Sequence, residues 1–120
     1  MKKEERQFIK KVWGYEIILV NCEEYCGKLL LLNKGAISSL HCHHNKKETF
    51  YCLEGQAVLT IDGKTFDLND MASAKTIFPN EYHQFEGLAR TSLLEISTHH
   101  DDNDVERKEP SKAGRNSWKL

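Results

Sequence analysis

The chain has 120 residues, of which 39% are hydrophobic and 29% are charged, and its formal net charge is −1. This length accommodates one domain with a single core. The near-neutral charge argues against binding to nucleic acid or anionic lipid by electrostatic attraction. The longest apolar run, Leu29–Leu32, is far shorter than the roughly 18 residues that cross a bilayer. The charged N-terminus has no apolar segment behind it, so we expect a cytoplasmic protein with no nucleic-acid or membrane partner.

In chain order, the first segment is Met1–Trp13, which could hold a short helix or form an arm. Short segments rich in β-branched, aromatic or leucine residues follow and predict strands. They cover residues 15–20, 28–32, 37–43, 49–53, 57–61, 65–68, 76–78 and 92–97. Turn signals separate them, among them Asn69-Asp70. Asp62-Gly63, between two apolar segments, predicts a hairpin with a type I′ turn.

The spacing of these strands predicts an all-β fold, a sandwich or barrel that closes to protect its edges. No central stretch has the 3.6-residue apolar period of a helix over eleven or more residues. We expect an N-terminal arm over residues 1–14, a β-barrel over 15–100 and a C-terminal tail over 101–120. The composition from Lys108 onward favours a solvated tail for the last residues.

The four cysteines are expected to be free thiols that bind no metal ion. Cys22 and Cys26 are separated by three residues, which is not the spacing of a zinc knuckle or a redox motif. Cys42 and Cys52 form no second close pair. A disulfide framework is typical of secreted proteins, and the N-terminal residues do not resemble a secretory signal.

Histidines and a carboxylate form the most informative cluster. His41 and His43 are two residues apart, so on a strand their side chains project from the same face while that of Cys42 points away. Glu48 begins the next predicted strand, and His83 follows a Pro-Asn turn. Three imidazoles and one carboxylate suit a divalent ion such as Zn, Mn, Fe, Ni or Co.

The spacing of this cluster resembles the first motif of the cupins: Gly35, five residues, His41-x-His43, four residues, Glu48, six residues, Gly55. Pro79 and His83 resemble the proline and histidine of the second cupin motif, one residue closer than usual. The resemblance implies a cupin fold, a jelly-roll barrel, with one metal ion held by His41, His43, Glu48 and His83.

Within the cupins, the chain resembles the type II phosphomannose isomerase domain over most of its length. The resembling segments are Val12–Glu16, Gly35–Leu40, Lys46–Phe50, Leu94–Ile96, Asp102–Arg107 and Gly114-Arg115. His41 stands where that family often has glutamine. The segment Ser97–His100 replaces its usual Gln-x-Gly stretch. The resemblance therefore implies a ligand of the sugar or sugar-phosphate class rather than an identical substrate.

Three further residues are candidates for chemistry or binding. Glu95 lies within a predicted strand among leucines, where an unpaired carboxylate is costly. It either lines the cavity as an acid/base group or faces solvent, and strand alternation allows both. Lys46 and Arg107 are candidates for binding a phosphate or sugar hydroxyls.

These residues favour a metal-dependent isomerase or epimerase of a sugar or sugar phosphate. In that reaction a metal would polarise neighbouring oxygens and Glu95 would carry the proton. The alternatives are a carbohydrate- or small-molecule-binding cupin without turnover, and a metal-dependent dioxygenase. Small cupins commonly dimerise through their N-terminal strands, so we also expect a homodimer.

Overall fold

The structure is a computed structural model that describes residues 1–69 and 74–120. It contains eleven strands: β1 (Gln7–Lys11), β2 (Gly14–Asn21), β3 (Cys26–Leu32), β4 (Leu40–Cys42), β5 (Glu48–Glu54), β6 (Gln56–Ile61), β7 (Lys64–Asn69), β8 (Lys75–Ile77), β9 (His83–Gly87), β10 (Thr91–Ser97) and β11 (Glu106–Glu109). The described residues form no helix, and so none that is long and apolar enough to cross a membrane.

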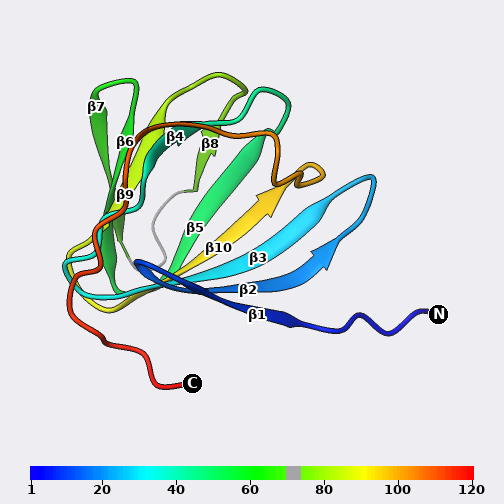
Figure 1. The fold of residues 1–120 in the computed structure, drawn as a ribbon, viewed down its shortest axis with the longest axis horizontal. Helices are drawn as coiled ribbons and strands as arrows, with labels where there is room; N and C mark the ends of the chain where they lie inside the picture. Colours follow the sequence, from blue (N-terminus) through cyan, green and yellow to red (C-terminus); the bar gives the residue numbers. More distant parts are fainter. Residues whose placement is uncertain (70–73) are drawn as a thin grey trace.

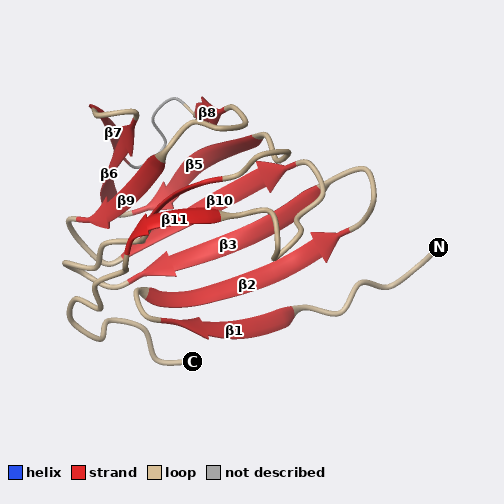
Figure 2. Ribbon diagram, turned by 45° about the horizontal axis from the view of Figure 1, so that its top comes forward, coloured by secondary structure: helices blue, strands red, loops and turns tan. Residues whose placement is uncertain are grey.

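The strands form two antiparallel sheets that face each other (Figures 1 and 2). The larger sheet has the order β1-β2-β3-β10-β5-β8, and the smaller has the order β11-β4-β9-β6-β7. Strands that are distant in sequence therefore lie side by side, such as β10 between β3 and β5. This arrangement confirms the expected all-β jelly-roll barrel.

The core lies between the inner faces of the two sheets. On β3, alternate residues point inward, so that Leu30 and Leu32 contribute to the core. Phe50 of β5 meets Phe85 of β9 across the barrel, with ring centroids 4.5 Å apart in an edge-to-face arrangement. Leu59 of β6 is fully buried beside them. These apolar side chains pack the two sheets together, and Phe50 and Phe85 also line a polar cavity between the sheets.

Each of the eight predicted strands is present, although the strand expected over 37–43 is limited to Leu40–Cys42. Residues 62 and 63 both have positive φ, 46° for Asp62 and 82° for Gly63, as a type I′ turn requires. The helix considered for Met1–Trp13 is wrong, because β1 turns at Val12-Trp13 and pairs with β2. The turn expected at Asn69-Asp70 extends outside the described residues.

The C-terminal segment returns to the barrel and runs alongside β4 (Figure 1). Strand β11 pairs with β4, and Lys112 exchanges backbone hydrogen bonds with Ile37. The indole of Trp118 donates to the carbonyl oxygen of Leu32 at 2.9 Å. A wholly solvated state for the last residues is therefore wrong, because their polar groups pair with the barrel. The division into arm, barrel and tail at residues 14 and 100 stays a prediction.

Candidate metal centre and ligand cavity

Four side chains from three strands and one loop converge between the sheets. His41 of β4 and His83 of β9 are register partners, and His43 lies just after β4. The ligand nitrogens of these three histidines lie within 4.8 Å of one another. Glu48 opens β5 in the opposite sheet, and its carboxylate oxygens are 3.3 Å from His43 Nε2 and 3.8 Å from His83 Nε2. We call these four residues the metal-ligand cluster.

Backbone carbonyls hold each imidazole of this cluster in one orientation. His41 Nδ1 donates to Ser39 O at 2.8 Å, His43 Nδ1 to Asp104 O at 2.7 Å, and His83 Nδ1 to Glu81 O at 3.0 Å. In neutral imidazoles these bonds place the proton on Nδ1 and leave the Nε2 lone pair free. Metal-binding histidines are oriented in the same way by a partner on the other nitrogen.

The cluster fits a divalent cation in two respects. Two of its polar atoms lack a hydrogen-bond partner among the described residues, and its histidines are neutral at neutral pH. Glu48 Oε2 and His83 Nε2 are buried and have no hydrogen-bond partner among residues 1–69 and 74–120. Burial lowers the pKa of His41 to about 3 and that of His43 and His83 to about 4. Burial also raises the pKa of Glu48, and the negative charge of Glu95 raises it further. A cation would satisfy both unpartnered atoms and favour the ionised carboxylate.

Asp104 holds the loop that carries His43. Its carboxylate accepts three backbone N–H groups, from His44 at 2.8 Å, Asn45 at 3.1 Å and Lys46 at 3.1 Å. Burial disfavours its charge, but these hydrogen bonds overcome that effect and lower its pKa. Its own carbonyl accepts the Nδ1–H of His43. The C-terminal segment therefore positions one ligand of the cluster directly.

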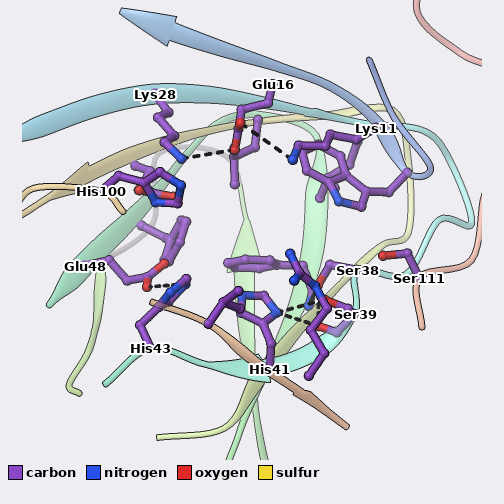
Figure 3. A pocket seen from close by; sticks show the side chains of 18 of the residues that line it. Lys11, Glu16, Lys28, Ser38, Ser39, His41, His43, Glu48, His100 and Ser111 are labelled. Carbon is purple, nitrogen blue, oxygen red and sulfur yellow. Dashed lines mark hydrogen bonds and ion pairs between the residues drawn. The ribbon is translucent and has the colours of Figure 1, made fainter. Parts of the chain in front are cut away.

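A cavity of about 300 Å³ opens beside the metal-ligand cluster. Figure 3 shows Lys28, Glu16 and Lys11 on the wall opposite His41 and His43. Lys28 Nζ donates to Glu16 Oε1 at 3.2 Å, and Lys11 Nζ lies 3.8 Å from Glu16 Oε2. Lys28 is 1% exposed, so its charge lies within the barrel and is balanced by Glu16.

Glu95 faces this cavity and is 3% exposed, which resolves the two orientations that strand alternation allowed. It accepts hydrogen bonds from Lys46 Nζ and from Ser97 Oγ, both at 3.1 Å. Burial opposes its ionisation, but Lys46 and Lys28 outweigh burial and lower its pKa. Burial likewise disfavours the charge of Lys46, and Glu95 and Glu48 overcome this and raise its pKa. The pair is therefore charged at neutral pH.

The Lys46–Glu95 pair extends to the surface through a histidine. Lys46 Nζ donates to His100 Nδ1 at 3.1 Å, and His100 Nε2 donates to Asp102 Oδ1 at 2.8 Å. Burial lowers the pKa of His100, and the charges of Lys28 and Lys46 lower it further. A neutral His100 can accept from Lys46 while it donates to Asp102.

Arg107 lines the same cavity from β11, where it is the register partner of His41. The structure thus brings together the residues proposed from the sequence. His41, His43, Glu48, Lys46, Glu95 and Arg107 line the cavity. His83 lies beside His41, with ring centroids 4.4 Å apart.

Two polar residues of the cavity wall, Lys28 and Glu16, are not predicted from the sequence. Lys28 has a signal, because it lies in phase with the inward-facing Leu30 of the same strand. Glu16 has none, since its role depends on a partner from another strand. The contact by which Asp104 holds the loop of His43 is not predicted either, because it joins residues 61 apart in the chain.

Comparison with known families and structures agrees with the fold. Residues 28–92 match the family described as cupin domain. No match was found among the curated proteins.

Solved structures share the fold at low sequence identity. KdgF from a Halomonas species is 14% identical with a TM-score of 0.73, and the match covers 82% of this chain and 89% of that one. Pac13 from Streptomyces, described as a nucleoside dehydratase, is 14% identical with a TM-score of 0.75 and coverage of 90% and 88%. Oxalate decarboxylase from Bacillus subtilis is 21% identical with a TM-score of 0.71 and coverage of 87% and 30%.

Proposed function

The chain belongs to the cupin family, and from this premise we propose that it is a metal-dependent enzyme that isomerises or epimerises a sugar or sugar phosphate. One observation carries the proposal. A buried carboxylate, Glu95, is kept ionised by Lys46 within the cavity that also receives the metal-ligand cluster. A site with an ionised base and a cation-binding cluster suits proton transfer at a carbon next to a carbonyl.

In the proposed isomerisation, Glu95 takes the proton from the hydroxyl-bearing carbon next to the carbonyl and returns it to the former carbonyl carbon, while the hydroxyl proton moves to the former carbonyl oxygen. In an epimerisation, solvent would deliver a proton to the opposite face of the carbon, and Glu95 would release its own proton to solvent. Lys46 donates to Glu95 Oε2 and stabilises the carboxylate before the first transfer and after the second. A divalent ion bound to His41, His43, Glu48 and His83 would supply Lewis acidity that makes this carbon more acidic. The resemblance to the type II phosphomannose isomerase domain supports this class of substrate.

Arg107 is proposed to bind an anionic group of the ligand, such as a phosphate. A guanidinium presents a fork of N–H donors that matches phosphate geometry. The β11–β4 pairing holds Arg107 beside His41, so one ligand can contact both the guanidinium of Arg107 and the metal-ligand cluster. Lys46 is proposed to contact the ligand from the Glu95 side.

The test is proton exchange by the full-length, metal-loaded protein. Aldose and ketose phosphates are incubated in deuterated water, and proton NMR follows loss of the signal at the carbon next to the carbonyl. We expect exchange with at least one sugar phosphate, reduced by on the order of 1,000-fold in Glu95→Gln. Glu54→Gln, at the exposed end of β5, is the matched control and should retain the activity.

Other outcomes would assign other functions. Saturable ligand binding without exchange would indicate a binding module, and oxygen consumption with ferrous ion would indicate a dioxygenase. Loss of water from the ligand is a further possibility, because the structurally similar Pac13 is described as a nucleoside dehydratase. We also propose a homodimer formed through β1, which is an edge strand of the larger sheet.

A further inference from the structure

A second group of ligand-type side chains lies on the other face of the β4–β11 pair. Cys42 and Glu106 are register partners, and they neighbour the pair His41 and Arg107 along the two strands. Since successive residues of a strand point to opposite faces, Cys42 and Glu106 project away from the cavity. His44, two residues after Cys42, projects to the same side and lies 3.6 Å from the Glu106 carboxylate through Nε2.

The three ligand atoms are close enough to share one ion. Cys42 Sγ, a nitrogen of His44 and a carboxylate oxygen of Glu106 all lie within 4.8 Å of one another. Cys42 Sγ is 3.9 Å from Glu106 Oε2. Cys42 is 2% exposed, whereas the side chains of His44 and Glu106 are 52% and 58% exposed. The thiol is therefore buried, whereas the other two ligand side chains are open to solvent.

Neighbouring polar groups orient two of the three ligands, an observation independent of their proximity. His44 Nδ1 donates to Asn80 Oδ1 at 2.8 Å, which leaves the Nε2 lone pair toward Cys42 and Glu106. Tyr82 donates its hydroxyl hydrogen to Glu106 Oε2 at 2.8 Å. Asn80 is itself held by a backbone hydrogen bond to the carbonyl of His43 at 2.7 Å. Partners of this kind fix the first ligands of metal sites.

We propose that Cys42, His44 and Glu106 bind a second metal ion of the zinc type, separate from the ion at the metal-ligand cluster. One thiolate, one imidazole and one carboxylate are a donor set that Zn²⁺ accepts, with water as the fourth ligand. On binding, the Cys42 thiol loses its proton to solvent and its sulfur bonds to the ion.

A metal ion at this site would link the barrel to its C-terminal segment. Cys42 ends β4 and His44 lies two residues later, whereas Glu106 begins β11. Fixing Glu106 also fixes Arg107, the next residue, which faces the cavity. The inference concerns the outer face of the sheet and stands whether or not the proposed isomerase activity is found.

The test uses cobalt as a spectroscopic probe in the full-length protein. Co²⁺ bound to a thiolate gives sulfur-to-metal charge-transfer absorption, whereas the metal-ligand cluster contains no sulfur. We expect two Co²⁺ per chain, with the charge-transfer band growing with one of the two equivalents. Zn²⁺ should displace the Co²⁺ and remove the band.

Variants then assign the band to the three residues. Cys42→Ser should abolish it, and Cys22→Ser, which alters a half-buried thiol outside the proposed site, should leave it unchanged. His44→Gln and Glu106→Gln change exposed side chains, so they should fold normally and bind only one Zn²⁺ tightly. His99→Gln, the matched loss of an exposed imidazole, should still bind two. Asn80→Gly keeps the positive φ of 71° accessible and should weaken the second ion by roughly 10- to 100-fold.

Three results would overturn the inference. The first is a folded wild-type protein that shows no charge-transfer band with excess Co²⁺. The second is an unchanged count of two tightly bound Zn²⁺ in both His44→Gln and Glu106→Gln. A single bound ion in wild type that is lost in His43→Ala would equally exclude a second site.

Discussion

His43 depends on two distant parts of the chain at once. Its Nδ1 donates to the carbonyl of Asp104, and its Nε2 lies 3.3 Å from Glu48. One residue is thus oriented by the C-terminal segment and directed toward a carboxylate of the opposite sheet. This double constraint leaves the ring little freedom, and it explains how a loop residue can serve in a rigid ligand set.

At this scale we predict that His43→Ala loses one equivalent of bound metal. Three ligands would remain, and the buried Glu48 carboxylate would lose its closest imidazole. Because a bound ion stabilises only the folded state, the melting temperature of the metal-treated protein should fall as well. Metal analysis and thermal denaturation measure both effects, with His99→Ala as the control. An unchanged metal content would contradict the assignment of His43.

A second prediction concerns Asp104→Asn. The amide would present an N–H group to backbone N–H groups that now bond a carboxylate, so the loop of His43 should loosen. We expect metal affinity at the cluster to fall by roughly 10- to 100-fold. Competition with a metal chelator measures the affinity. Asp101→Asn, in the same turn but exposed, should retain the wild-type value.

At the scale of elements, β2 and β3 approach so closely at their ends that only glycine fits. Gly14 has φ of 146°, and a Cβ atom there would lie 1.8 Å from the carbonyl oxygen of Leu31. This close approach allows the Val12-Trp13 turn to return β1 onto the sheet. It also places Trp13 in the core and on the cavity wall.

We therefore predict that Gly14→Ala destabilises the protein by roughly 3 kcal/mol, the upper range for one substitution. The melting temperature should fall by on the order of 10 °C. Gly63→Ala is the control, because its φ of 82° is also positive but no atom lies within 4 Å of the added Cβ. It should cost only about 1 kcal/mol. Equal losses for the two variants would exclude the clash with Leu31 as the cause.

The β11 strand supports a prediction on ligand binding. Arg107→Lys should keep the metal but bind phosphorylated sugars roughly 10-fold more weakly, because lysine cannot form the paired hydrogen bonds of a guanidinium. Binding of neutral sugars should not change. Calorimetry with both ligand classes measures the difference, and equal loss for both would contradict the role. A chain ended after Thr98 would also lose Asp104, so we expect it to lose metal affinity too.

At the scale of the whole molecule, the interior of the barrel combines apolar packing with buried charges. Phe50, Phe85 and Leu59 belong to the apolar core, whereas Lys28, Lys46 and Glu95 are buried charged residues. Phe50 and Phe85 also line the cavity that these charged residues line. Buried charges contribute little to stability by themselves, since desolvation offsets their attraction. The apolar core therefore stabilises the fold more than the buried charges do.

The burial of the three histidines predicts how stability depends on pH in the metal-free protein. The pKa values of His41, His43 and His83 are about 3 to 4 in the folded state, against about 6.5 in an unfolded chain. Between these values the unfolded chain binds more protons, so stability decreases as the pH falls from about 6.5 to 4. Thermal denaturation of chelator-treated protein measures this, and the double variant His41→Gln/His83→Gln should flatten the dependence. A melting temperature that stays constant over this range would contradict the depressed pKa values.

The sequence alone determined eight of the eleven strands, the turn at Asp62-Gly63 and the spacing of His41, His43 and Glu48. These features depend on residues that are close along the chain, where alternation and turn chemistry are direct physical constraints. The strand β9 was not among those predicted. Nor were β1 and β11, because Gln7–Lys11 and Glu106–Glu109 are polar, exposed edge strands. Such strands form by pairing with a neighbour rather than by their own apolar pattern.

Only the tertiary structure decided where Glu95 points and which cations neutralise it. Its orientation depends on Lys46, which lies 49 residues away in the chain, and its environment depends on Lys28 of a neighbouring strand. The clamp of Asp104 on His43 joins residues 61 apart. Electrostatic partners act through space, so strand periodicity carries no record of them. The folding of two sheets around one cavity is what brings the Lys46–Glu95 ion pair, Lys28 and the metal-ligand cluster together.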